Sequence, residues 1–190
     1  MTINRRSFLA RSGALGAASF AAMHLAMPRA YAQTEDGTIS IALAARSPNG
    51  INPQQSGLTG GDNWALYQVF NALVASKPGT FAVTPEDFQP ALAESWEVSE
   101  DARTWTYHLR RGVQFHKGYG EMTSKDVMFT YGRQLDPEIV SAGKVLFGNI
   151  ESIDAPDDYT FVVTLVRPDP LFNASTAVTL AASIICQAAF

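Results

Sequence analysis

The residues of this 190-residue chain that could do chemistry are few and are not grouped for it. His108 and His116 could bind a metal ion, but no His-x-x-x-His or Cys-x-x-Cys spacing accompanies them. Ser47, Ser56 and Ser141 could act as nucleophiles, but the chain has no Gly-x-Ser-x-Gly sequence. We therefore predict no catalytic residue and no metal ligand, and we interpret both histidines as structural.

The paired carboxylates also have a structural explanation. Glu100-Asp101 and Asp157-Asp158 lie in predicted turns, where Asp is favoured because it hydrogen-bonds nearby backbone. Gly118-Tyr119-Gly120 is too short to cradle a phosphate, and no Walker-type lysine follows it. The sequence therefore predicts neither an enzyme nor a cofactor.

The elements that would position these residues are clearest between Pro90 and Val127. Hydrophobic residues alternate with polar ones around Trp96 and again from Trp105 to Leu109, which predicts two half-buried strands. We expect Trp96 and Trp105 to lie in the core. Thr123 followed three places later by Asp126 predicts a capped helix that ends at Asp136-Pro137. Its predicted buried face consists of Val127, Met128, Tyr131 and Leu135.

Weaker patterns predict the remaining elements. A strand is expected over 38–45, a hairpin over 76–90, a strand pair over 150–153 and 160–165, a helix over 171–182 and a strand over 181–186. A helix is expected after Asp62, with its buried face formed by Leu66, Val69, Phe70, Leu73 and Val74. In the hairpin, Pro78-Gly79 should form the turn and Phe81 and Val83 should lie on a strand.

The first 32 residues have the features of an export signal. Arg5-Arg6 forms a twin-arginine pair, an Ala- and Gly-rich apolar run covers 13–27, and Ala30 and Ala32 occupy the positions that a signal peptidase reads. We predict a Tat signal peptide over 1–32 and therefore the Tat translocase as a partner during export. The expected location is the periplasm. Because Gln33 rather than a cysteine would follow the cleavage site, we expect a soluble protein without a lipid anchor.

Charge and cysteine content narrow the class of protein. Residues 1–32 carry four arginines and no acid, so the remaining chain has 10 basic and 18 acidic residues, a formal charge of −8. Such a surface offers no cationic track for phosphates, which argues against nucleic acid and anionic lipid as partners. Cys186 is the single cysteine, so no internal disulfide can form.

The stretch from Pro90 to Val127 resembles the signature of the family 5 extracellular solute-binding proteins, the peptide and nickel receptors of ABC importers. The matching residues are Leu92, Ala93, Glu94, Ser95, Trp96, Ser99, Asp101, Leu109, Arg110, Gly112, Val113, Phe115, His116, Gly118, Thr123, Asp126 and Val127. A second match follows at Ile153, Asp154, Asp157, Tyr159, Thr160, Val163 and Leu165.

The resemblance implies an α/β fold of the periplasmic-binding-protein class II, in its large three-domain form, with only the first lobe represented. Residues 33–48 would start the sheet of lobe I, 49–167 would form an α+β subdomain with the signature, and 168–190 would return to lobe I. We expect the chain to be an N-terminal fragment, because members of the family continue much further.

The function implied by this resemblance is solute capture by a monomeric periplasmic receptor for the permease subunits of an ABC importer, with di- or oligopeptides as the first expectation. Nickel, haem or a sugar remains an alternative solute, and a non-transport regulatory or chaperone-like role remains a third. In the family, the loop after the first strand lines the cleft, and Arg46 could meet a carboxylate there or be an ordinary exposed arginine. The expected ligand-binding residues are Ala45, Arg46, Ser47, Pro48, Asn49 and Trp64.

Overall fold

The computed structural model describes residues 34–35, 38–39, 50–54, 60–141 and 143–190, and the chain divides into two compact units, residues 1–44 and 45–190. In the first unit, β1 (Thr34–Glu35) pairs antiparallel with β2 (Thr38–Ile39). The rest of the strand predicted over 38–45 lies outside the described residues. So do the signal-peptide residues Arg5, Arg6, Ala30 and Ala32, and the Tat signal stays a prediction.

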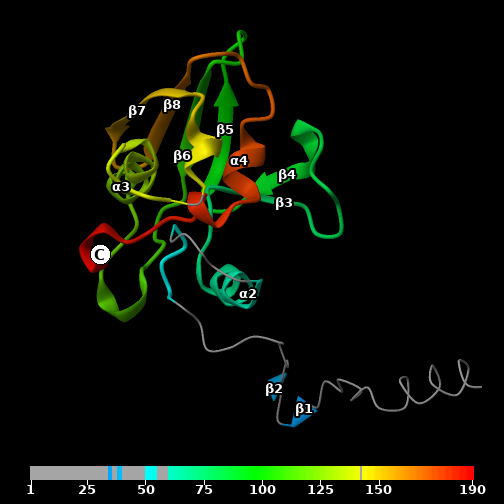
Figure 1. Ribbon diagram of the computed structural model, residues 1–190, viewed down its shortest axis with the longest axis vertical. Coiled ribbons are helices and arrows are strands. Elements are labelled where there is room, and N and C mark those ends of the chain that lie inside the picture. Colours follow the sequence, from blue (N-terminus) through cyan, green and yellow to red (C-terminus); the bar gives the residue numbers. More distant parts are fainter. Residues whose placement is uncertain (1–33, 36–37, 40–49, 55–59, 142) are drawn as a thin grey trace, which may run out of the picture. The chain divides into compact units, whose positions relative to one another are not determined.

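The second unit is built on a four-stranded antiparallel sheet with the order β5-β6-β8-β7 (Figure 1). Its strands are β5 (Ala93–Val98), β6 (Thr104–Leu109), β7 (Ile150–Asp157) and β8 (Thr160–Leu165). Both strand pairs predicted from the alternation are present, and β6 joins them by pairing with β8, for example Tyr107 with Phe161. The register places the apolar residues of the two central strands on one face.

That face forms the core of the second unit. Trp105, Tyr107 and Leu109 of β6 are buried together with Phe161, Val163 and Leu165 of β8. Helix α3 (Ser124–Leu135) supplies Tyr131, whose ring lies 5.0 Å from Phe161 and 5.3 Å from Phe147 between centroids. Trp96 packs half-buried against this core, whereas Val98, at the end of the edge strand β5, is 41% exposed.

Helix α3 begins and ends where the sequence predicts. The Thr123 side chain accepts a hydrogen bond from the Lys125 amide, and Asp126 accepts one from the Thr123 amide, so the capping box is formed. The helix ends at Leu135, because Pro137 disfavours helical backbone at Asp136. Of its predicted apolar face, Val127 and Tyr131 are fully buried, and Met128 and Leu135 are half-buried against the core.

The predicted hairpin before the sheet is present, but its strands are shorter. β3 (Val74–Ser76) pairs with β4 (Phe88–Pro90), with a 3-10 turn from Pro85 to Asp87 between them. The prediction of Phe81 and Val83 as strand residues is wrong, since they lie in the connection and are 95% and 69% exposed. The Asp87 carboxylate accepts hydrogen bonds from the Val83 and Thr84 amides, which therefore do not bond to a partner strand.

The helix predicted after Asp62 is α2 (Gly60–Val69), and it ends before part of its expected apolar face. Leu66 is buried, but Val69 is 60% exposed and Phe70 lies beyond the end. Leu73 and Val74 are buried through the β3 hairpin instead, where the Leu73 carbonyl accepts hydrogen bonds from the Ala91 and Ala93 amides. From the sequence alone, a short apolar run can be either the end of a helix or the start of the next strand.

The C-terminal part has less regular structure than predicted. The helix expected over 171–182 is replaced by α4 (Asn173–Ala177) and a 3-10 turn from Leu180 to Ala182. The strand expected over 181–186 is absent, because its backbone bonds to α3 side chains, to its own turns and, at the Ile184 amide, to the Asn71 carbonyl, and these bonds form no strand ladder. Phe172, Ala182 and Ile184 join the same core as the sheet. The predicted boundary between 49–167 and 168–190 stays a prediction.

The helices in the described part of the chain are all too short or too polar to cross a membrane.

Candidate ligand-binding surface

The structure describes one of the six residues predicted to bind the ligand. Ala45, Arg46, Ser47, Pro48 and Asn49 lie outside the described residues, and their role stays a prediction. Trp64 lies on α2 and is 40% exposed. No pair of predicted site residues falls within the described part of the chain, so none is shown in contact.

The exposed side of α2 is aromatic. Trp64 and Tyr67 are three residues apart and therefore lie on neighbouring positions of the helix surface. Tyr67 is 49% exposed, and its hydroxyl donates a hydrogen bond to the Val178 carbonyl at 2.9 Å. Partial burial raises the pKa of Tyr67 above its ordinary value, so the phenol is neutral at physiological pH. Exposed rings of this kind could stack on or pack against a ligand.

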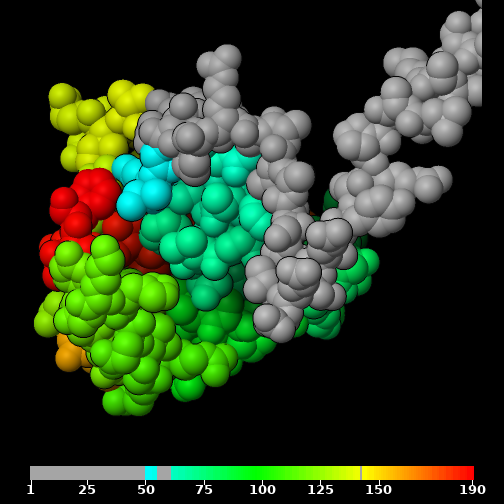
Figure 2. All heavy atoms as spheres, turned by 90° about the horizontal axis from the view of Figure 1, so that it is seen from below, coloured from blue at the N-terminus to red at the C-terminus, as the bar shows by residue number. Residues whose placement is uncertain are grey.

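Just after the predicted loop, the chain is anchored by Gln54. The Asn52 side chain accepts a hydrogen bond from the Gln54 amide at 3.0 Å, which closes a tight turn. The Gln54 side chain is buried and donates to the carbonyls of Thr130, at 2.9 Å, and Ala181, at 3.2 Å. Figure 2 shows residues 50–54, in cyan, beside the C-terminal segment, in red.

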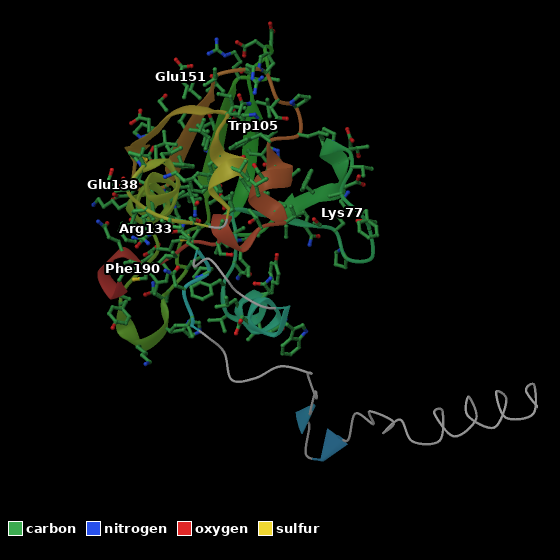
Figure 3. All side chains as sticks on the ribbon, in the orientation of Figure 1. Lys77, Trp105, Arg133, Glu138, Glu151 and Phe190 are labelled. Carbon is green, nitrogen blue, oxygen red and sulfur yellow. The ribbon has the colours of Figure 1, made fainter. Side chains whose placement is uncertain are left out.

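Arg133 of α3 completes this anchor. Its Nε donates to the Gln54 side-chain oxygen at 2.9 Å. Its guanidinium lies 4.1 Å from the centroid of the Phe190 ring and 5.6 Å from that of Phe129. The labelled side chains of Arg133 and Phe190 lie next to each other in Figure 3.

Polar side chains along one stripe of α3 bind the backbone of the C-terminal segment. Asp126 accepts a hydrogen bond from the Gln187 amide at 2.9 Å, Thr130 accepts one from the Ile185 amide at 3.0 Å, and Gln134 donates one to the Ala181 carbonyl at 3.1 Å. We call these three residues, with Gln54 and Arg133 and the segments 50–54 and 181–187 that they hold, the α3 joint.

The α3 joint was not predicted from the sequence, apart from Asp126 as a helix cap. A signal was available, because Asp126, Thr130 and Gln134 follow one another at intervals of four in an amphipathic helix. Three polar residues on one stripe beside an apolar face indicate a buried polar contact. Gln54 carries no such pattern, since it follows Asn52-Pro53 in a short irregular segment.

A hollow of about 350 Å³ lies at another part of the sheet, near the end of β6 and the turn between β7 and β8. It is lined by Glu94, His108, Leu109, Arg111, Asp157, Asp158, Tyr159 and Thr160. The Arg111 guanidinium lies 4.1 Å from the centroid of the Tyr159 ring, and the Tyr159 hydroxyl donates to Glu121 at 2.9 Å. Hydrogen bonds from the Gly112 amide and then the Tyr159 hydroxyl lower the pKa of Glu121. Because these groups bond to one another, we assign them a structural role in stabilising the turns beside the hollow.

The two histidines of the described residues, His108 and His116, lie apart from each other. His108 is on the outer face of β6, with Nε2 3.4 Å from the Glu97 carboxylate, and His116 begins an exposed 3-10 turn, His116–Gly118. Across residues 50–54, 60–141 and 143–190, no three His, Cys, Asp or Glu residues are grouped to hold a metal ion. Their structural role stays a prediction.

The chain is similar in sequence to several bacterial binding proteins. It is 35% identical over 167 residues to Heme-binding protein A of Haemophilus influenzae, covering 77% of this chain and 30% of the relative. It is 36% identical over 153 residues to the Dipeptide-binding protein of Escherichia coli, covering 71% and 27%. The chain thus spans less than a third of the length of these relatives.

Solved structures of periplasmic binding proteins share its fold. The ABC transporter-associated periplasmic binding protein of Helicobacter pylori, in complex with the peptide STSA, superposes with a TM-score of 0.61 at 32% identity, covering 72% of this chain and 28% of that one. A periplasmic binding protein from A. tumefacien R10 in complex with mannopinic acid superposes with a TM-score of 0.64 at 33% identity, covering 70% and 27%. The class II periplasmic-binding-protein fold predicted from the signature is confirmed, and the described part is a partial α/β domain.

The family profile matches residues 87–188, more than half of the chain, and its description is "Bacterial extracellular solute-binding proteins, family 5 Middle". The matched range contains the signature hairpin, α3 and the second strand pair, which are the elements that the sequence placed most accurately. By this match and the relatives above, the chain belongs to the family 5 bacterial extracellular solute-binding proteins.

Proposed function

We propose that this chain is part of the periplasmic solute-binding component of an ABC importer and that its solutes are di- or oligopeptides. The observation that carries this proposal is the similarity to receptors named for peptides. They include Di/tripeptide-binding protein 1 of Pseudomonas aeruginosa, which is 34% identical over 192 residues and matches 91% of this chain. A receptor of this kind needs no reaction, since it works by burying its solute between two walls.

The residues proposed to meet the ligand are the loop Ala45, Arg46, Ser47, Pro48 and Asn49, together with Trp64 of α2. The loop backbone could pair with an extended peptide as an added strand. Arg46 could hold a peptide carboxylate by a charge-assisted hydrogen bond. Trp64 supports this role by being exposed and by standing beside a second exposed ring, Tyr67.

Haem is the second candidate solute. It is favoured by the 35% identity to Heme-binding protein A, a value in the same range as the identities to the peptide receptors. The matched residues are chiefly strand faces, turns and a helix cap, which support the scaffold and do not distinguish one solute from another.

The remaining parts of the proposal follow from the sequence and the family. The protein would leave the cytoplasm through the Tat translocase, act in the periplasm as a monomer without a lipid anchor, and deliver its solute to ABC permease subunits. No enzymatic step is proposed, because the family is one of solute-binding proteins.

Calorimetry on the protein isolated from the periplasm tests the solute. We expect a mixture of di- and tripeptides to bind. Haem, whose binding is measured from its absorption spectrum, should not bind. Arg46→Gln should weaken peptide binding about tenfold or more, the effect of losing one charge-assisted hydrogen bond. Arg167→Gln, at an exposed position in the bend after β8, is the matched control and should bind like the unmodified protein. Haem binding without peptide binding would favour the second candidate and overturn the first.

A further inference from the structure

The α3 joint holds two chain segments that are more than 120 residues apart in sequence. Segment 50–54 precedes the range that the family profile matches, residues 87–188, and segment 181–187 lies at the C-terminal end of that range. Both segments contact helix α3. The Gln54 side chain, which belongs to segment 50–54, bonds to α3 and to segment 181–187. Both of its amide protons and its oxygen are used, on Thr130, Ala181 and Arg133 respectively.

The Ala181 carbonyl is the point where the two segments meet. It accepts one hydrogen bond from Gln54 and another from Gln134, so both of its lone pairs are occupied. Breaking either contact leaves a buried carbonyl partly unsatisfied, which carries a free-energy cost beyond the bond itself. The position of segment 50–54 therefore affects how firmly segment 181–187 is held.

The other contacts of segment 181–187 fix its register along the helix. Thr130 and Asp126, which are both buried, accept hydrogen bonds from the Ile185 and Gln187 amides, so a shift by one residue would break both of these bonds. Gly143 adds a steric constraint, because a Cβ at this position would collide with the Ala181 side chain. Ala181 is thus held by hydrogen bonds and by close backbone packing.

We propose that the α3 joint makes these two segments one cooperative unit, in which 50–54 and 181–187 leave α3 together, and that Gln54 couples them. The proposal is independent of which solute the receptor binds. It identifies α3 as the helix that ties the C-terminal end of the family-matched range to a segment that precedes this range.

Native-state hydrogen exchange on the intact chain in increasing urea tests the unmodified protein. We expect the amide protons of Gln54, Ile185 and Gln187 to open with one free energy and one urea dependence, at a lower free energy than the amides of β6. The proposal would be overturned if the Gln54 amide opened with one free energy and the Ile185 and Gln187 amides opened with another. The proposal would also be overturned if these three amides exchanged only when the β6 amides exchange, because their opening would then be part of global unfolding.

Gln54→Met tests the coupling residue, since it keeps the length of the side chain and removes its hydrogen bonds. Exchange at Ile185 and Gln187 should rise about tenfold, the equivalent of about one buried hydrogen bond, although their own acceptors are unchanged. Exchange in β6 should stay the same. Gln68→Met on exposed α2 is the matched control and should change none of these rates.

Gly143→Ala gives an independent test from the steric side. By displacing Ala181, it should raise exchange at Gln54 as well as at Ile185, although Gly143 bonds to neither. Acceleration confined to 50–54 in Gln54→Met, or confined to 181–187 in Gly143→Ala, would show that the segments open independently and would overturn the proposal.

Discussion

The sheet core and the α3 joint lie on different sides of the same helix, and they are held by different forces. In the core, the Tyr131 ring of α3 packs against the rings of Phe147 and Phe161, and this packing does not depend on a hydrogen bond between two particular atoms. In the joint, Thr130, one residue earlier, holds Ile185 by a single hydrogen bond at 3.0 Å. Hydrophobic burial is non-directional, whereas a buried polar contact depends on one partner at one place. The core should therefore contribute more stability, and the joint should contribute more positional control.

The largest expected effect is in the core. Phe161→Ala should lower the free energy of unfolding by about 3–5 kcal/mol, because Phe161 is fully buried and its removal leaves a cavity against Tyr131 and Tyr107. Urea denaturation measures this loss. Phe81→Ala is the matched control and should change stability by less than about 0.5 kcal/mol, since Phe81 is 95% exposed. Equal losses for the two would contradict the assignment of the core.

A middle-sized effect is expected in the joint. Thr130→Val keeps the shape but removes the hydroxyl that accepts from the Ile185 amide and donates to the Asp126 carbonyl. The free energy of unfolding should fall by about 1–3 kcal/mol, because a buried amide loses its acceptor. Thermal unfolding would check it, and Thr106→Val on the outer face of β6 is the control. A loss as large as that of Phe161→Ala would remove the distinction between the two regions.

A smaller effect is expected at the start of α3, the element that both regions share. Thr123→Ala removes the cap and should cost about 1 kcal/mol of stability. Circular dichroism during urea unfolding would measure it, and Thr80→Ala, in the exposed β3–β4 connection, is the comparison. If the helix is instead held only by its packing, Thr123→Ala and Thr80→Ala should be indistinguishable.

The smallest effect concerns pH at the periphery. Hydrogen bonds from the Val83 and Thr84 amides and then the Thr84 hydroxyl lower the pKa of Asp87. A carboxylate whose pKa is lower in the folded state stabilises the protein above its unfolded pKa, and this contribution is lost as pH falls through the folded pKa. Stability should thus decline below about pH 4, where Asp ordinarily titrates.

Asp87→Asn cannot ionise, so it should make the urea midpoint slightly less dependent on pH between about 5 and 2. Glu86→Gln, at the neighbouring exposed position, is the control. An identical pH profile in Asp87→Asn and the unmodified protein would show that the exposed turn contributes nothing measurable.

The core could be predicted from the sequence because its signals are local. Alternation placed Trp105, Tyr107 and Leu109 on one face, and the Thr123–Asp126 spacing placed the start of α3. Each of these patterns reports on contacts within a few residues. The same local reading misplaced Leu73 and Val74, because their burial depends on pairing with a segment that begins only at Phe88.

The joint could not be predicted in the same way. The apolar run at 181–186 suggests a strand, but its backbone is bonded by side chains from α3 and by Gln54 and the Asn71 carbonyl, both more than 100 residues earlier. Nothing near Gln54 in the sequence indicates such a partner. For the candidate ligand surface, the sequence placed Trp64 and Tyr67 on one helix, but it gave no sign of the hydrogen bond from the Tyr67 hydroxyl to the Val178 carbonyl, 111 residues later.

The order of the sheet has a consequence for solubility. β5 is an edge strand, and such a strand can recruit a strand from another molecule and so start aggregation. The exposed carboxylates of Glu94 and Glu97 lie along it, and like charges would repel when two such edges approach each other. The signature block that identifies the family thus also places two exposed carboxylates on an edge strand, where their charge opposes pairing with another strand.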